Sequence, residues 1–152
     1  MDPLSISASV AGLLALSGSI YSILARFTSS INDAPRSAHS AMVAVEGMRI
    51  ALSSVEELIR TINAVPQRRK VLIQLDHLII TLTQSMITFS ELEAQVSPFI
   101  ADSAAEPSTW DRLKFAWQEE RILISIQRLE SHKSSIMLML SILQWYGKGL
   151  FQ

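Results

Sequence analysis

The sequence predicts an all-α protein, a bundle of four long helices forming one domain. Apolar residues recur every three or four positions through almost the whole chain, which is the helical period. No stretch shows the alternation typical of strands, and the five prolines fall at breaks between the periodic stretches. At 152 residues the chain can bury one sizeable core and is too short for two domains to be expected.

The first two helices are bounded by turn chemistry. Asp2-Pro3 is typical of a helix start, because proline at the first helical position loses no hydrogen bond, and the helix can run to about Ser30. Residues 32–35 (NDAP) predict a stop and a restart. The apolar stripe of the second helix is Ala38, Met42, Val45, Met48, Leu52, Val55, Ile59 and Ile62, with charged residues mainly off it.

The last two helices follow the same logic. Residues 63–66 (NAVP) end the second helix, and Ser97-Pro98 ends the third. The stripe of the third is Val71, Leu75, Leu78, Leu82, Met86, Phe89, Leu92 and Val96. Residues 99–108 are predicted to be a loop, and a fourth helix runs from about Thr109 to Tyr146, or splits in two near 118–121. Its heptad residues are Ile122, Ile126, Leu129, Ile136, Leu140 and Leu143. The predicted domain covers 1–147, and 148–152 is predicted to be a tail, in part foreign to the natural chain.

The residues give no pattern for catalysis or for metal or cofactor binding. There is no cysteine, and His39, His77 and His132 are far apart without metal-ligand spacing. Asp76-His77 could form an acid–base pair, but neighbours on a helix point about 100° apart, which favours a solvated edge. The sequence therefore predicts that the chain is not an enzyme and holds neither metal nor cofactor.

Two basic groupings could contact anionic lipid headgroups, although a solvated face is the simpler interpretation. They are Arg68, Arg69 and Lys70 in the third helix and Lys114, Arg121 and Arg128 in the fourth. A net charge of −1 argues against nucleic acid as a partner. Trp110, Trp117, Trp145 and Tyr146 are predicted to pack in the core or at the bundle end, or, for Trp145 and Tyr146, at a membrane interface.

The opening helix is the most informative element. Residues 3–25 carry no charge and, at about 1.5 Å per residue, span about 35 Å, enough for a hydrocarbon core of about 30 Å. A secretory signal is not expected, because no basic segment precedes the apolar run. The large apolar residues gather on one side of this helix, and we name them as the membrane-inserting set: Leu4, Ile6, Val10, Leu13, Leu16, Ile20, Leu24 and Phe27.

A second set of small residues lies on a different side, at Ala8, Gly12, Ala15 and Ser19. Small residues four apart let helices approach closely, as in membrane helix pairs. The alternative is a core helix crossed tightly by its neighbours, and both hold if the helix is shielded at rest and released later. Gly12→Leu would distinguish them, since overpacking a core costs about 1–3 kcal/mol.

Four segments closely resemble one family in order along the chain. They are MDPLSISASVAGLLALSGSIYSIL, INDAPRSAHSAMVAVEGMRIALSSVEELI, LIQLDHLIITLTQSMITFSELEAQV and WDRLKFAWQEERILISIQRLESHKSSIMLMLSILQ. Together they resemble the HeLo-like N-terminal domain of fungal NLR-like (STAND) proteins up to about Gln144. That resemblance implies a helical bundle placed before nucleotide-binding and repeat domains.

By the same resemblance the function is regulated cell death in innate immunity or heterokaryon incompatibility. Related HeLo domains, and the similar bundle of the mixed-lineage kinase-like pseudokinase, oligomerise and permeabilise membranes. The implied partners are further copies of the chain, anionic membrane lipids and the downstream domains. The implied location is the cytoplasm, with relocation to the plasma membrane on activation. The alternative is a soluble module that docks homotypically or heterotypically without membrane activity.

Overall fold

The computed structural model describes residues 3–31, 33–62, 69–99 and 109–150, without the side chains of 3–4, 69–72, 109–113, 147 and 149–150. Four long helices make up almost all of it: α1 (Pro3–Ser30), α2 (Arg36–Ile62), α3 (Arg69–Val96) and α4 (Thr109–Leu150). A 3₁₀ turn, η1 (Ser97–Phe99), follows α3. The predicted all-α bundle of four long helices is confirmed.

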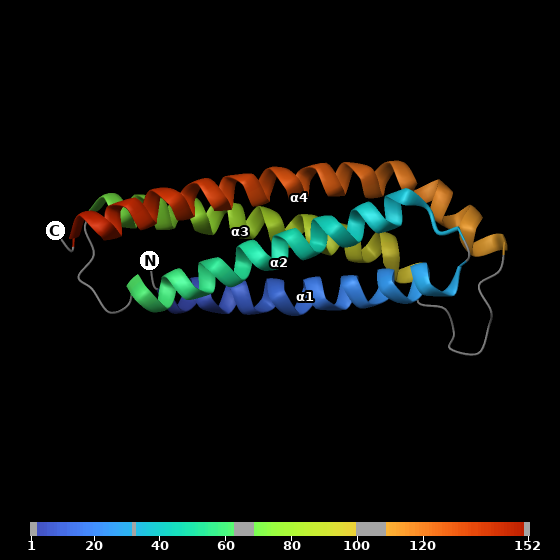
Figure 1. Cartoon of the computed structure of the whole chain (residues 1–152), viewed down its shortest axis with the longest axis horizontal. Helices are drawn as coiled ribbons and strands as arrows, with labels where there is room; N and C mark the ends of the chain where they lie inside the picture. Colours follow the sequence, from blue (N-terminus) through green and yellow to red (C-terminus); the bar gives the residue numbers. More distant parts are fainter. Residues whose placement is uncertain (1–2, 32, 63–68, 100–108, 151–152) are drawn as a thin grey trace.

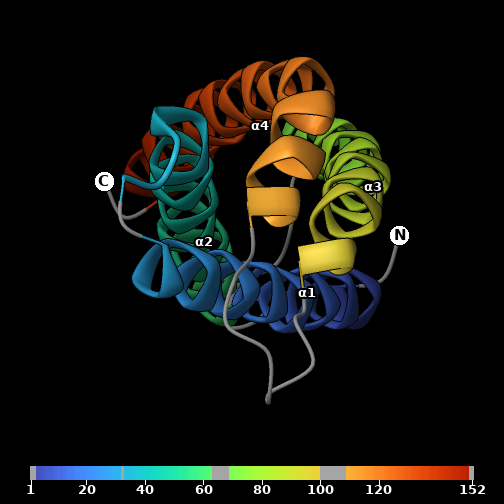
Figure 2. The same cartoon turned by 90° about the vertical axis from the view of Figure 1, so that its right-hand side faces the viewer.

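The helices alternate in direction along one long axis (Figure 1). Viewed down that axis in Figure 2, α1 packs against α2 and α3, and α4 packs against the same two helices from the opposite side. Consecutive helices α2 and α3 are therefore diagonal to each other, as are α1 and α4. Two of the four neighbouring pairs are antiparallel, α1 with α2 and α3 with α4, and the other two are parallel.

The predicted stripes of α2 and α3 form the core. On α2 every stripe residue is buried except Met42 and Ile62, which are half-buried. On α3 every stripe residue with a described side chain is buried except Met86, which is half-buried, while Val71 lies outside the described side chains. Fully burying each aliphatic side chain stabilises the fold by about 1.5–3 kcal/mol, and these stripes are what hold the helices together.

The junction between α1 and α2 has the expected turn chemistry. Asp33 adopts a left-handed backbone conformation with φ of 64°. Aspartate is one of the few residues with a side chain that tolerates this region, so α1 stops here at modest cost. The Ala38 backbone N–H then donates to the Pro35 carbonyl oxygen at 3.0 Å, which begins α2.

Three phenylalanines close one end of the bundle. Phe115 of α4 stacks on Phe27 of α1 at a centroid distance of 4.8 Å, and Phe99 of η1 contacts both rings at 5.1 and 5.2 Å. The predicted loop over 99–108 was therefore wrong at its first residue, because Phe99 is a buried core residue in a 3₁₀ turn. The rest of that predicted loop lies outside the described residues.

Helix α4 is longer than predicted. It is continuous from Thr109 to Leu150, so the alternative split near 118–121 is not observed. Its first turns tilt away from the axis of the rest (Figure 1), which brings Phe115 over the end of the bundle. The predicted heptad residues of α4 are buried apart from Ile126, which is half-buried.

Candidate functional site

The predicted membrane-inserting set of α1 lies inside the bundle. Ile6, Val10, Leu13, Ile20, Leu24 and Phe27 are each at most 5% exposed. Leu16 is half-buried against the core, and the side chain of Leu4 lies outside the described residues. In this structure these side chains hold α1 to α2 and α3, so they can meet lipid only if α1 leaves the bundle.

The small residues of α1 form its outer face. The predicted set Ala8, Gly12, Ala15 and Ser19 is exposed throughout, together with Ser5, Ser9, Ala11 and Ser22. A tight crossing by neighbouring helices along this face, the alternative considered above, is therefore not observed. A Cβ added at Gly12 would meet the Met86 methyl at 3.5 Å, an ordinary contact, so a bulkier residue there need not overpack the core.

The outer face is unusual because it has no charge. Amphipathic surface helices normally carry charged residues opposite the core, as α2 does with Glu46, Glu57 and Arg60. On α1 the first charged residue is Arg26. Residues 5–30 contain an 18-residue window of mean hydropathy 1.7, enough for a membrane-spanning helix by length and composition, a test that the core helices of soluble proteins also pass.

A shallow hollow lies beside this face, between α1 and α2. It measures about 390 Å³ and is open to solvent. The lining residues are Leu14, Glu46, Arg49, Ile50, Ser53, Ser54 and Glu57. Arg49 is engaged with Glu46 at 3.2 Å, so its charge is already matched. The lining mixes two apolar side chains with hydroxyls and surface ions, and the wide opening offers no enclosed site for a reaction.

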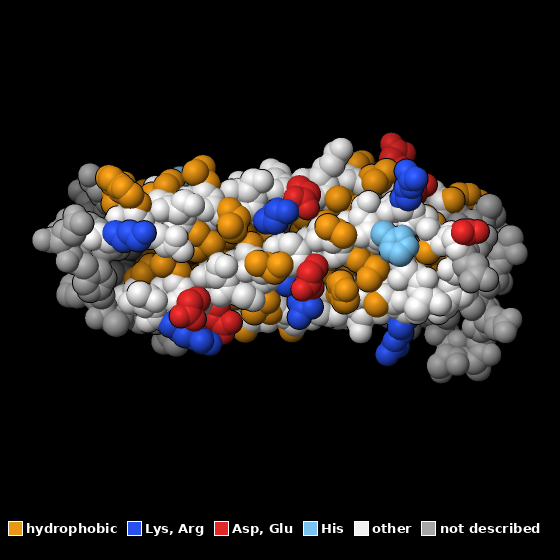
Figure 3. All heavy atoms as spheres, viewed as in Figure 1, with side chains coloured by type: hydrophobic (Ala, Val, Ile, Leu, Met, Phe, Trp, Pro, Cys, Tyr) orange, Lys and Arg blue, Asp and Glu red, His pale blue; other side chains and the backbone are white. Residues whose placement is uncertain are grey.

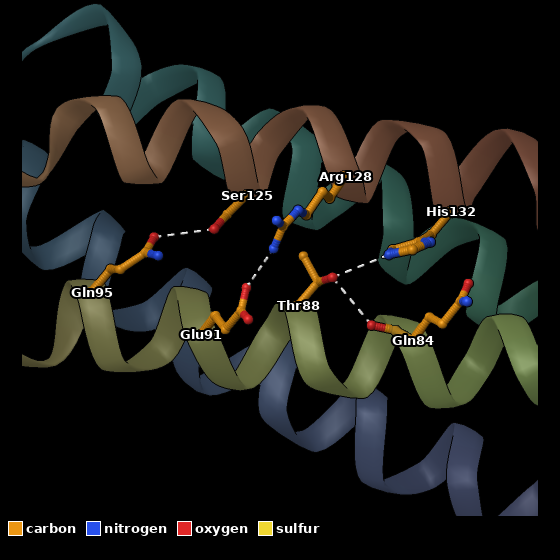
Figure 4. Close-up of polar contacts among 7 residues, drawn as sticks. All are labelled: Gln84, Thr88, Glu91, Gln95, Ser125, Arg128 and His132. Carbon is orange, nitrogen blue, oxygen red and sulfur yellow. Dashed lines mark hydrogen bonds and ion pairs between the residues drawn. The ribbon is translucent and has the colours of Figure 1, made fainter.

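A row of polar contacts joins α3 to α4, and we call it the polar seam (Figure 4). The Ser125 hydroxyl donates to Gln95 Oε1 at 3.1 Å, and Arg128 Nη1 donates to Glu91 Oε2 at 2.9 Å. Thr88 Oγ1 lies 3.1 Å from His132 Nε2. From one contact to the next the residue numbers fall along α3, from 95 to 88, and rise along α4, from 125 to 132. The seam therefore fixes the antiparallel register of the two helices.

The seam also sets the state of His132. The Thr88 hydroxyl donates to the Gln84 carbonyl oxygen at 3.1 Å, which leaves Nε2–H of His132 as the donor to Thr88. Burial, and second the Arg128 guanidinium, lower the pKa of His132 below its ordinary value of 6.5. The neutral imidazole is therefore the form that the folded chain favours.

We expect the chain to lose stability as pH falls below 6.5, because the unfolded state takes up a proton on His132 before the folded state does. The loss ends once pH passes the lower pKa of the folded state. His132→Gln keeps a donor near Thr88 and removes the titration. Urea unfolding at about pH 7.5 and about pH 5.5 should show a smaller difference for the variant than for the wild type. Equal differences would show that His132 does not contribute.

The predicted headgroup-binding residues do not form one described patch. Arg121 is exposed, Lys114 is half-buried, and Arg128 is tied to Glu91 within the polar seam. Arg68 and the side chains of Arg69 and Lys70 lie outside the described residues. The Glu91 carboxylate offsets the charge of Arg128. Arg128 therefore adds little to the attraction between the three basic residues of α4 and anionic lipid.

The remaining acid–base and metal candidates lie at the surface in the described part of the chain. Asp76 and His77 are both exposed, as is His39. Within the described residues, no three side chains of His, Asp or Glu lie together in a group that could hold a metal ion. Trp117 is 71% exposed and is not a core residue. Trp145, for which a membrane interface was the alternative, is 72% exposed, Tyr146 is half-buried, and the Trp110 side chain lies outside the described residues.

The chain matches no protein-family model, no curated protein and no solved structure. The geometry of the bundle, and of α1 above all, therefore carries the functional argument.

Proposed function

We propose that this chain is an effector or signalling domain of the HeLo-like kind from a fungal NLR-like receptor, without enzymatic activity. Clustering by downstream domains releases α1, which inserts into the plasma membrane as part of an oligomer and induces cell death. The observation that carries the proposal is the uncharged outer face of α1, opposite a face of large apolar residues.

A released α1 could enter a bilayer without burying any ion before Arg26. One Lys or Arg at the bilayer centre costs about 2.5–3.5 kcal/mol, so an uncharged stretch removes the largest barrier to insertion. The set that now faces the core would then face lipid. Ala8, Gly12 and Ser19 would let helices from several copies pack closely.

Release has a cost that explains why clustering is needed. α1 packs against both α2 and α3, and its departure would expose their apolar faces to water. A lone copy would return α1 to the bundle. Several copies held together can bury those faces against one another, which shifts the population toward the released state.

A second function has support from a different observation. The described large apolar side chains of α1 are in the core or packed against it, as expected for a helix that never leaves the bundle. In that case the chain is a soluble docking module for a like or unlike partner, and membranes are not involved.

A reversible cross-link between α1 and α2 separates the two functions. Thr28 of α1 and Met42 of α2 are in contact, with Oγ1 3.6 Å from Sδ. The chain has no cysteine, so Thr28→Cys with Met42→Cys can be joined selectively by a reducible bis-maleimide. Dye release from anionic liposomes is then measured on the clustered, linked protein before and after the linker is cleaved by reductant.

The membrane function requires low release while α1 is linked and restored release after cleavage. Thr28→Cys alone, treated in the same way, should release dye throughout. If the liposomes release no dye in any state, and circular dichroism shows that the clustered protein is folded, the membrane function is overturned and the docking module remains. Equal release with and without the link would show that α1 does not need to leave α2.

A further inference from the structure

The outer side of α4 carries large apolar side chains along most of its length. Six of them are 43–72% exposed: Trp117, Leu123, Ile124, Met137, Leu138 and Trp145. On the face seen in Figure 3, hydrophobic side chains lie at several places between charged groups. Isolated exposed apolar residues are common on proteins, but a row of them along one helix marks a surface for association.

These residues are arranged symmetrically about Ser131. Trp117 lies fourteen positions before it and Trp145 fourteen after, and Ile124 and Leu138 lie seven before and seven after. Steps of seven keep all five on the outward side of the helix, with a drift of about 20° per step, and we call these five residues the α4 row. The two outer tryptophans are 71% and 72% exposed, Ile124 and Leu138 are 43% and 63% exposed, and the central serine is small and exposed.

A two-fold symmetric contact requires that if residue i of one copy meets residue j of the other, then j also meets i. An antiparallel pair of α4 helices centred on Ser131 meets this condition. Each Trp117 faces a Trp145, each Ile124 faces a Leu138, and the two serines meet at the axis, where small side chains allow close approach. We propose that the resting chain forms a dimer with a second copy of itself through the α4 row.

The charges beside the row fit the antiparallel arrangement. Glu120 and Arg121 lie in the first half of the exposed stretch, and the equivalent positions of the second half are Ser141 and Ile142. In the antiparallel pair Glu120 faces Ile142 and Arg121 faces Ser141, so neither charge meets another ion. Arg128, already tied to Glu91, likewise faces Ser134. No like charges are brought together along the row.

The surface is large enough for a stable pair. From Trp117 to Trp145 is 28 residues, about 42 Å of helix at 1.5 Å each. The four large side chains of the row offer on the order of 600 Å² per copy, at the low end of the roughly 600–1,000 Å² per partner of stable interfaces. This dimer concerns a different helix from the one in the proposed function, and it is tested in the absence of lipid.

Sedimentation equilibrium of the whole chain should show a dimer, and Leu138→Lys should weaken the dimer by about 100-fold or more. Leu138 is 63% exposed, so the variant should stay folded. Ile80→Lys, at a 55% exposed position on α3, is the matched control and should leave the dimer intact. A monomeric wild type, or equal weakening by both variants, would overturn the proposal.

Single cysteines test the orientation. Ser131→Cys places two thiols at the proposed axis and should form a disulfide between copies under mild oxidation. Ser141→Cys should not, because its two thiols would be about 30 Å apart in the antiparallel pair. Cross-linking of Ser141→Cys as readily as Ser131→Cys would contradict the antiparallel row, and no cross-linking of Ser131→Cys would place the contact elsewhere.

Discussion

Ala15→Lys is expected to abolish dye release from anionic liposomes while changing the free energy of unfolding by no more than about 0.5 kcal/mol. Ala15 is at the middle of residues 3–27 and exposed on the outer face of α1, where a lysine meets only water in the resting bundle. In an inserted helix the same lysine would lie near the bilayer centre at a cost of about 2.5–3.5 kcal/mol per copy. That cost corresponds to a loss of about 100-fold in the insertion constant of each helix.

The measurement compares dye release by the clustered wild type, Ala15→Lys and Ser53→Lys. Ser53 is an exposed residue on α2, so its variant adds the same charge to a helix that is not expected to insert. Only Ala15→Lys should fail. Wild-type release by Ala15→Lys would show that α1 does not cross the bilayer, and failure of both variants would assign the effect to the net charge. Deleting α1 is a poorer test, because deletion also removes core residues such as Leu13 and Ile20.

The number and extent of the helices were predictable because they depend on local pattern. The spacing of apolar residues in α2 and α3, and breaks at Asp33-Ala34-Pro35 and Ser97-Pro98, are properties of short stretches, and they place the helix ends within a few residues. The order of helices around the bundle was not predictable. It depends on which stripe packs against which, and the α2 and α3 stripes are similar enough to fit either neighbour.

The sequence predicted which residues of α1 lie together on each side of the helix. It did not predict what surrounds each side. The apolar and small residues of α1 were assigned to two sides of the helix, and the structure places them on opposite sides, core and solvent. Small residues alone could not indicate whether a neighbour packs on them, since alanine and serine suit a tight crossing and a solvated face alike. Trp117 and Trp145 were assigned to the core or the bundle end, with a membrane interface as the alternative for Trp145. Both are exposed, because α4 turns its heptad residues toward the core.

Phe99 and Phe115 are buried, and the sequence pattern did not predict their burial. Phe99 follows Ser97-Pro98, where the helical period ends, and so periodicity gave no reason to bury it. Its burial comes from the meeting of three segments distant in sequence, the end of α1, the turn after α3 and the start of α4. Local sequence pattern does not reveal a contact between segments that are distant in sequence. An aromatic residue beside a predicted helix break is nevertheless a hint of such a contact.

Phe115→Ala is expected to lower the free energy of unfolding by about 3–5 kcal/mol, the usual cost of deleting a buried phenyl ring. Phe115 is 0% exposed and contacts Phe27 and Phe99. Removing its ring therefore leaves an apolar cavity that water does not fill favourably. At about 2–4 °C per kcal/mol the midpoint of thermal unfolding should fall by roughly 10 °C. Phe115→Leu keeps most of the buried volume and should cost only about 1–2 kcal/mol.

Urea unfolding followed by circular dichroism would measure both variants. The ring cluster joins the C-terminal end of α1 to the first turns of α4, two helices that are otherwise diagonal across the bundle. A loss near 1 kcal/mol for Phe115→Ala would mean that these first turns of α4 contribute little to the fold. A loss in the expected range would make the cluster the contact that any release of α1 must break, because Phe27 cannot leave the core without separating from Phe115.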